Sequence, residues 1–200
     1  MAQRFAQTSR GIVSFRLHRV LDVHAGFSKR HEDITIDGIY QDGAVVKVHV
    51  VSYTIDGKNA DSAQLAEIAQ AYERPKPGQA SALPFDARYT GDYSYREQVP
   101  GTIAFVSTLH DAGHGNGTFT YDASNSVLTY TYQPNVLPPH ASWGEIADRR
   151  AEVLPNYWTV TQETQHYKGS YGPFPGAATE EIDFSAFRRF SDLQSAVNAL

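Results

Sequence analysis

A long alternation of apolar and polar residues near the start of the chain limits the possible folds more than any other feature. From Val13 to Val23 the odd-numbered positions are apolar except for Arg19, and the even-numbered positions are polar except for Val20. A period of two over about twelve residues predicts one long strand with one face on a core. Strands of that length are typical of a strongly curved sheet or a barrel.

Three Asp-Gly pairs come next, at residues 37–38, 42–43 and 56–57, among residues with high β-strand propensity. Asp-Gly between such segments is a strong signal for a tight turn between antiparallel strands. We therefore expect a turn at each pair, and a meander of consecutive strands over this part of the chain.

A helix is expected at about residues 61–74, between two runs of strands. Leu65, Ile68 and Tyr72 recur at helical spacing and form one apolar face. Asp61 is suited to cap the first turn. The residues expected to end the helix are Pro75, Pro77 and Gly78. Because this helix interrupts the strands, we expect it to cover the sheet as a lid, with Leu65, Ile68 and Tyr72 on its underside.

The rest of the chain predicts further strands, with turn residues at 122–126 between two of them. Residues 143–154 have helical propensity, but their position among strands favours a strand. The last ten residues predict a short helix that Ser191 or Asp192 would cap. We expect a single domain over residues 1–200 that is mainly β: a curved antiparallel sheet or half-open barrel of about nine to eleven strands, with one covering helix and a short C-terminal helix.

The composition excludes several classes of function. The net charge of −5 offers no basic excess to neutralise phosphates, so nucleic acid is not an expected partner. The absence of cysteine excludes disulfides and thiolate chemistry. No apolar run approaches the ~18 residues of a transmembrane segment, and the first residues lack the apolar core of a secretory signal. We therefore expect either a cytoplasmic protein or the mature form of an exported one.

The most concentrated chemical groups lie in the sequence LHDAGHGNG at residues 109–117. His110, Asp111 and His114 are three metal-capable side chains, since imidazole is a common ligand of zinc, copper and nickel. The glycines instead favour a hairpin in which Asp111 and His114 hydrogen-bond the turn backbone, and the Glu of the helical zinc motif is missing. A metal-dependent enzyme centred on these residues stays open as one alternative. Beyond it we recognise no catalytic motif and expect no cofactor.

Large apolar and aromatic residues on one face of several expected strands favour a binding function. A curved sheet capped by a helix can enclose an apolar cavity that is open to a ligand. The residues expected to line its concave side are Val13, Phe15, Leu17, Phe105, Tyr130 and Tyr132. The alternative is a filled core, in a structural or protein-interaction module that meets its partner through an exposed edge strand or aromatic patch.

The order of a strand meander, a covering helix, more long strands and the late sequence FSAFRRF resembles that of the periplasmic lipoprotein carriers of the Lol type. The segment GTFTYDASNSVLTYTYQP is similar to the part of that family in which two strands flank a turn with Asp. The resemblance implies a half-open antiparallel barrel closed by a helical lid. It also implies non-catalytic binding or transport of an apolar small molecule, a lipid, an acyl chain or a lipoprotein by a periplasmic or secreted protein, with another envelope protein as a further partner.

Overall fold

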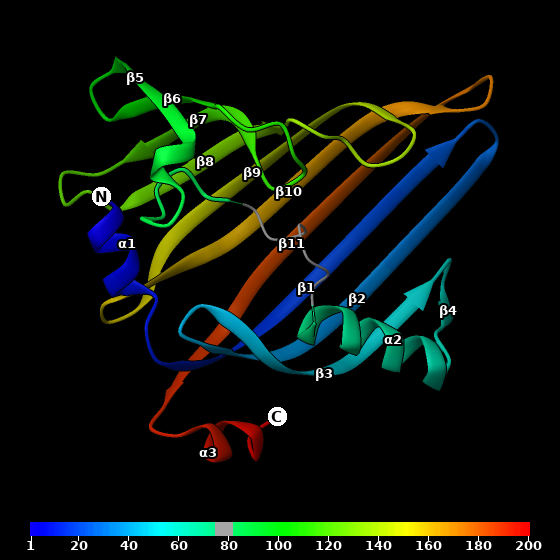
Figure 1. The fold of residues 1–200 in the computed structure, drawn as a ribbon. Helices are drawn as coiled ribbons and strands as arrows, with labels where there is room; N and C mark the ends of the chain where they lie inside the picture. Colours follow the sequence, from blue (N-terminus) through cyan, green and yellow to red (C-terminus); the bar gives the residue numbers. More distant parts are fainter. Residues whose placement is uncertain (75–81) are drawn as a thin grey trace.

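One antiparallel sheet of eleven strands forms the body of the protein in the computed structural model, which describes residues 1–74 and 82–200 (Figure 1). β1 (Ile12–Ala25) lies inside the sheet and pairs with β2 (Ser28–Gln41) on one side and with β11 (Phe174–Phe190) on the other. The strand order is β4-β3-β2-β1-β11-β10-β9-β8-β7-β6-β5. The prediction of a mainly β, antiparallel fold is therefore confirmed.

The sheet extends from β1 in both directions and curves without closing. On the side of β2 it continues with β3 (Ala44–Ile55) and β4 (Lys58–Asn59). On the side of β11 it continues with β10 (Tyr157–Tyr171), β9 (Ala141–Leu154), β8 (Val127–Pro134), β7 (Gly115–Tyr121), β6 (Thr102–Ser107) and β5 (Tyr93–Val99). Residues 143–154, predicted as a strand against their helical propensity, lie within β9. Because β4 and β5 are the two edges, the curved sheet is open.

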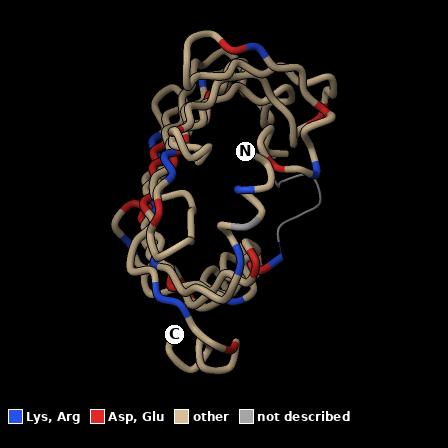
Figure 2. Tube along the Cα trace, turned by 90° about the vertical axis from the view of Figure 1, so that its left-hand side faces the viewer, with Lys and Arg blue, Asp and Glu red and all other residues tan. Residues whose placement is uncertain are grey.

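Short helices accompany the sheet. α1 (Ala2–Thr8) lies on the inner side of the curve (Figure 2). α2 (Ser62–Glu73) packs against β3, α3 (Leu193–Val197) follows β11, and a single 3-10 turn, η1 (Thr90–Asp92), precedes β5. None of the helices within residues 1–74 and 82–200 has the length and hydrophobicity needed to cross a membrane.

The covering helix α2 begins as its sequence predicts. The Asp61 carboxylate accepts hydrogen bonds from the backbone N–H groups of Ala63 and Gln64, each at 2.9 Å, and the Gln64 side chain accepts one from the Asp61 N–H at 2.8 Å. This reciprocal capping box satisfies donors that the first turn leaves without an intrahelical partner. The residues predicted to end the helix, Pro75, Pro77 and Gly78, lie outside the described residues.

The Asp-Gly pairs behave differently from one another. Residues 42–43 and 56–57 form turns in which both residues have positive φ, as the sequence predicts. The prediction of a turn at 37–38 is wrong, because β2 runs straight through this pair and Gly38 lies opposite Phe15 in β1. A Cβ atom on Gly38 would lie 2.4 Å from Cζ of Phe15. Here glycine makes room for an aromatic ring rather than for a turn.

Large buried side chains form two clusters on the inner face of the sheet. The first cluster lies mainly on β5 to β9 and consists of Phe85, Tyr93, Phe105, Phe119, Val127, Tyr130, Tyr132 and Ile146. The second cluster lies on β1 to β3 and β11 and consists of Phe15, Leu17, Ile34, Ile36, Val48, Tyr53 and Ile182. β10 runs between the strands of the first cluster and those of the second.

Candidate ligand-binding site

The residues predicted to line the concave side fall into two separate groups. Phe15 and Leu17 belong to the second cluster, and Val13 is fully buried on the same strand. Phe105, Tyr130 and Tyr132 belong to the first cluster, where their rings stack on one another. The structure therefore brings each group together and separates the two by the strands between them. The predicted lid residues all pack against the second cluster: Leu65, Ile68 and Tyr72.

Charged residues occupy the inner face between the two clusters. The strand register aligns one row across seven strands: Tyr130, Asp148, Glu163, Ile182, Arg19, Ile34 and Tyr53. The adjacent row consists of Tyr132, Ile146, Gln165, Glu180, Leu21, Glu32 and Ile55. We call the five charged members of these rows the polar floor: Arg19, Glu32, Asp148, Glu163 and Glu180. The inner face is thus apolar at both sides and ionisable in the middle.

One half of the polar floor is an ion-pair network. Arg19 donates a hydrogen bond to Glu32 at 2.9 Å and lies 3.4 Å from a carboxylate oxygen of Glu180. Tyr53 and Arg30 donate further bonds to Glu32, at 2.9 and 2.6 Å. Since the Arg19 side chain is only 14% exposed, its positive charge is balanced by carboxylates from β2 and β11.

The other half is a pair of acids that face each other. Asp148 in β9 and Glu163 in β10 are direct register partners, and Asp148 is buried. Burial raises the pKa of Asp148 to about 8, and the nearby Glu163 charge acts in the same direction. Burial also raises the pKa of Glu163. Two carboxyl groups this close share a proton instead of both ionising.

A chain of hydrogen bonds continues from this acid pair along β10. Tyr167 donates to Gln165 Oε1 at 3.2 Å, and Gln165 Nε2 donates to Glu163 Oε1 at 2.6 Å. The Oδ1 atom of Asp148 is buried and accepts no hydrogen bond from the residues that the structure describes. Protonation of Asp148 lowers the cost of burying this unpaired oxygen, because a neutral carboxyl group loses less hydration free energy than a carboxylate.

The side chain of Arg150 lies beside the acid pair. Its guanidinium carbon is 5.1 Å from the ring centroid of Phe5 in α1 and 5.6 Å from that of Phe85. These cation–π contacts place the guanidinium over two aromatic rings that also pack edge-on against each other. Burial lowers the pKa of Arg150, although the Asp148 carboxyl acts in the opposite direction. Arginine keeps its proton in proteins, so the site retains a positive charge.

Three adjoining cavities run along β10, and the members of the polar floor that line them are Asp148 and Glu163. The first, of about 580 Å³, lies against Arg150, Val160 and Glu163 and is roofed by α1 and by the segment before η1. The second, also about 580 Å³, shares Glu163 with the first and is roofed by the loop at 134–139. The third, about 300 Å³, shares Tyr167 with the second. The third cavity is lined mainly by small and apolar residues, among them Val23, Ala25, Pro138, Ala177 and Ala178.

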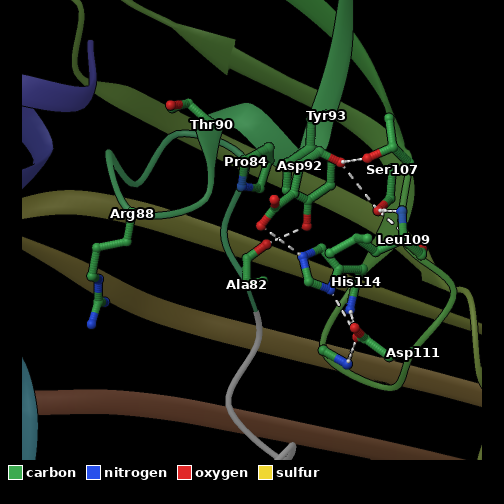
Figure 3. A network of polar contacts seen from close by, with 12 residues as sticks. Ala82, Pro84, Arg88, Thr90, Asp92, Tyr93, Ser107, Leu109, Asp111 and His114 are labelled. Atoms are coloured by element: carbon green, nitrogen blue, oxygen red, sulfur yellow. Dashed lines mark hydrogen bonds and ion pairs between the residues drawn. The ribbon is translucent and has the colours of Figure 1, made fainter.

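Residues 109–117, which we call the histidine loop, form a hydrogen-bond network at the edge of the first cluster (Figure 3). His114 is buried, and its ring nitrogens contact Asp111 at 2.7 Å and Asp92 at 3.2 Å. Burial alone would lower the pKa of His114, but the hydrogen bonds to both carboxylates outweigh it and raise the pKa. The Asp111 carboxylate also accepts the backbone N–H of Gly113 at 2.8 Å.

The predicted metal ligands are therefore only partly brought together. Asp111 and His114 are in contact, whereas His110 is exposed. In residues 1–74 and 82–200 no group of three or more His, Cys, Asp or Glu side chains is arranged to hold a metal ion. Because both His114 ring nitrogens already contact carboxylates, metal binding there would require a new arrangement of the loop. The metal-site hypothesis stays a prediction.

Sequence reasoning missed the polar floor, although one signal pointed to it. Arg19 is the residue that interrupts the apolar face of β1, and it stands in the middle of the floor. A charged residue on the apolar side of a long strand indicates a partner of opposite charge on the same face. Nothing in the sequence identifies that partner, because Glu32 and Glu180 are supplied by different strands.

The comparisons with known proteins concern the shape of the sheet alone. No protein-family model and no curated protein sequence matches the chain. Structural similarity extends over 92% of the chain to lipovitellin, with a TM-score of 0.43 and 8% identity, and covers 26% of the lipovitellin chain. A DUF1329 family protein from Desulfovibrio piger has a TM-score of 0.40 and 13% identity, with 98% of this chain and 92% of that one covered.

The MucA/MucB complex of Pseudomonas aeruginosa is also similar, with a TM-score of 0.24 and 11% identity over 95% of this chain and 98% of that one. This chain spans about a quarter of the lipovitellin chain that it matches. At these scores and identities the similarities carry no argument about function. The site is therefore interpreted from its own geometry.

Proposed function

We propose that the protein binds an apolar ligand without catalysis, on the inner face of its curved sheet. The ligand class is a lipid, an acyl chain or a lipoprotein, and the resemblance of the sequence to lipoprotein carriers favours transport in the bacterial envelope. The observation that carries the proposal is the crevice along β10, in which three adjoining cavities run from Arg150 to Ala177.

The size and length of this crevice support an elongated ligand. Each of the two larger cavities, about 580 Å³, falls within the roughly 300–1,000 Å³ of small-molecule sites. The cavities follow β10 from Val160 to Gly169, a run of about 30 Å at ~3.3 Å per residue. A compact polar ligand would leave most of that length empty, whereas a long acyl chain extends along the greater part of it.

The apolar clusters flank the crevice in this proposal. Val13, Phe15 and Leu17 lie on a strand to one side of β10, and Phe105, Tyr130 and Tyr132 lie on strands to the other side. Of these six residues, Tyr132 alone lines one of the three cavities. α2 acts as a lid through Leu65, Ile68 and Tyr72, which cover the second cluster. Each buried methylene of a ligand contributes about 0.8 kcal/mol, so even partial filling of the crevice gives substantial affinity.

Filling the crevice with protein atoms tests the proposal. Val160→Trp adds an indole beside the first cavity, which Val160 lines. We expect this variant to lose at least ten-fold in affinity for Nile red, a neutral apolar dye, and for laurate. The matched control is Val106→Trp, at an exposed valine of β6, which should bind both as the wild-type protein does. Failure of the wild-type protein to bind either probe, or equal binding by both variants, would contradict the proposal.

A further inference from the structure

Arg150 is a half-buried cation at one end of the crevice, with no ion-pair partner among the described residues. Neither a carboxylate nor any other acceptor within residues 1–74 and 82–200 hydrogen-bonds its guanidinium, whose contacts are the faces of Phe5 and Phe85. Other arginines of the first cavity differ in this respect. Arg88 forms a bidentate pair with Asp86, and Arg10 donates to the backbone carbonyl of Ala6.

A cation in this position lacks the partner that its burial requires. Removing a charge from water costs free energy that an opposite charge or a set of hydrogen bonds normally compensates. The guanidinium donates no hydrogen bond to a described residue, so its N–H groups remain available to a ligand in the cavity that Arg150 lines. The wall also carries a second donor without an acceptor among the described residues, the indole N–H of Trp158.

We propose that Arg150 binds the carboxylate head group of a long-chain fatty acid whose hydrocarbon chain lies along β10. This inference rests on the proposed function and names the ligand class of the same crevice. The guanidinium edge matches a planar carboxylate in two parallel hydrogen bonds. A single positive charge balances one carboxylate, whereas a phosphate dianion would leave a negative charge uncompensated.

The two ends of the crevice fix the direction of the fatty acid. The head group contacts Arg150 in the first cavity, and the chain passes the acid pair into the second and third cavities. Glu163 lines the path, and the proton it shares with Asp148 removes one of the two negative charges that would oppose the ligand. The far end is lined mainly by small and apolar residues, such as Val23, Ala25 and Ala178, although Lys168 also belongs to its lining.

The experiment compares three probes: laurate, 1-dodecanol and butyrate. Laurate and dodecanol share a chain and differ in charge, whereas butyrate has the head group without the chain. Trp158 lines the first cavity and reports binding by its fluorescence, after the chain's second tryptophan is removed by Trp143→Phe. Bound laurate is counted independently by equilibrium dialysis with a radiolabel.

The expected result is that wild-type protein prefers laurate to dodecanol and does not bind butyrate. Arg150→Met should weaken laurate binding by about ten- to a hundred-fold, the value of a charge-assisted hydrogen bond, and leave dodecanol binding unchanged. Arg150→Lys keeps the positive charge but lacks the planar fork of guanidinium donors. Its affinity for laurate should therefore lie between those of the wild-type protein and Arg150→Met. The matched control is Arg149→Gln, which removes the neighbouring exposed arginine of the same strand and should bind laurate normally.

Two outcomes would overturn the inference. Equal affinity of the wild-type protein for laurate and dodecanol would leave apolar binding intact and remove the role of Arg150. If Arg150→Met and Arg150→Lys lost affinity for laurate and dodecanol equally, with circular dichroism unchanged, the role of Arg150 would be to maintain the shape of the cavity instead. Absence of binding of both long-chain probes to the wild-type protein would contradict the proposed function itself.

Discussion

Asp148 and Glu163 face each other as register partners across β9 and β10, and the Oδ1 atom of Asp148 has no hydrogen-bond partner in the described chain. This contact makes the middle of the inner face an acid pair that shares a proton. An apolar chain can pass a pair with one negative charge at lower cost than a pair with two. The protonation of the pair therefore links pH to both stability and ligand binding.

The first prediction concerns stability against pH. Burial raises the pKa of Asp148 to about 8 and raises that of Glu163, whereas unfolded acids titrate near 4. Between these values the folded protein holds more protons than the unfolded chain, so stability falls as pH rises. We expect the free energy of unfolding to drop by about 1–3 kcal/mol between pH 5 and pH 8 in urea titrations.

The Asp148→Asn variant distinguishes the contribution of the acid pair to this pH dependence from the contributions of other titrating groups. The amide can donate to Glu163 without a shared proton, so the variant should lose most of this pH dependence. Glu180 and His114, whose pKa values are also raised, remain unchanged and provide the residual slope. An identical pH profile in Asp148→Asn and the wild-type protein would show that the pair does not share a proton.

The second prediction concerns Gly38, where the sequence indicates a turn and the structure has a strand. Gly38→Ala places a Cβ atom 2.4 Å from the Phe15 ring, which is buried and stacked on Tyr40. The ring must shift, and we expect a loss of about 1–3 kcal/mol in the free energy of unfolding. Gly91→Ala is the control, since its Cβ would meet no atom within 4 Å.

A companion variant identifies the cause of that loss. Phe15→Leu in the Gly38→Ala background removes the colliding ring edge, so part of the lost stability should return. Additive losses in the double variant would instead mean that glycine is required for a backbone reason.

The third prediction concerns the lid. Leu65 packs against the second cluster from α2, and Leu65→Asp places a charge in that contact. We expect this variant to release bound ligand faster while the sheet keeps its far-ultraviolet circular dichroism. Ala66→Asp, at the next and exposed position of the same helix, provides the control. Unchanged ligand retention in Leu65→Asp would count against a lid function for α2.

The fourth prediction concerns the histidine loop. Hydrogen bonds to Asp111 and Asp92 raise the pKa of His114, so the charged imidazole stabilises the folded protein below its ordinary pKa and loses this effect as pH rises through the raised one. His114→Gln should therefore lower the melting temperature more at pH 5.5 than at pH 9. Stoichiometric zinc in elemental analysis, lost in His114→Gln and in His110→Ala, would instead support the metal site.

Local features of the fold follow from the sequence, and distant pairings do not. The alternation around Phe15 predicts β1, and the pairs at 42–43 and 56–57 predict turns, because neighbouring residues alone determine these features. Gly38 has the same local signal as a turn, but the Phe15 ring that requires it comes from another strand. A tertiary contact thus overrides a correct local rule.

The candidate site was less accessible to sequence reasoning than the fold. The aromatic residues of the clusters follow from strand alternation, as at Phe105 and Tyr130. The pairing of Asp148 with Glu163 depends on the register of β9 and β10, which includes an irregularity between Val160 and Gln162. A shift of one residue would turn these side chains to the other face, so no pattern within either strand reveals the acid pair.

The most direct test of the binding account is native mass spectrometry of the purified protein, followed by organic extraction and re-addition of laurate to the extracted protein. The account predicts a bound mass that extracts as a lipid or fatty acid, or, for protein that loses its ligand during purification, one laurate molecule per chain after re-addition. A bare polypeptide mass in both states would contradict it and would favour a filled, protein-interacting β module.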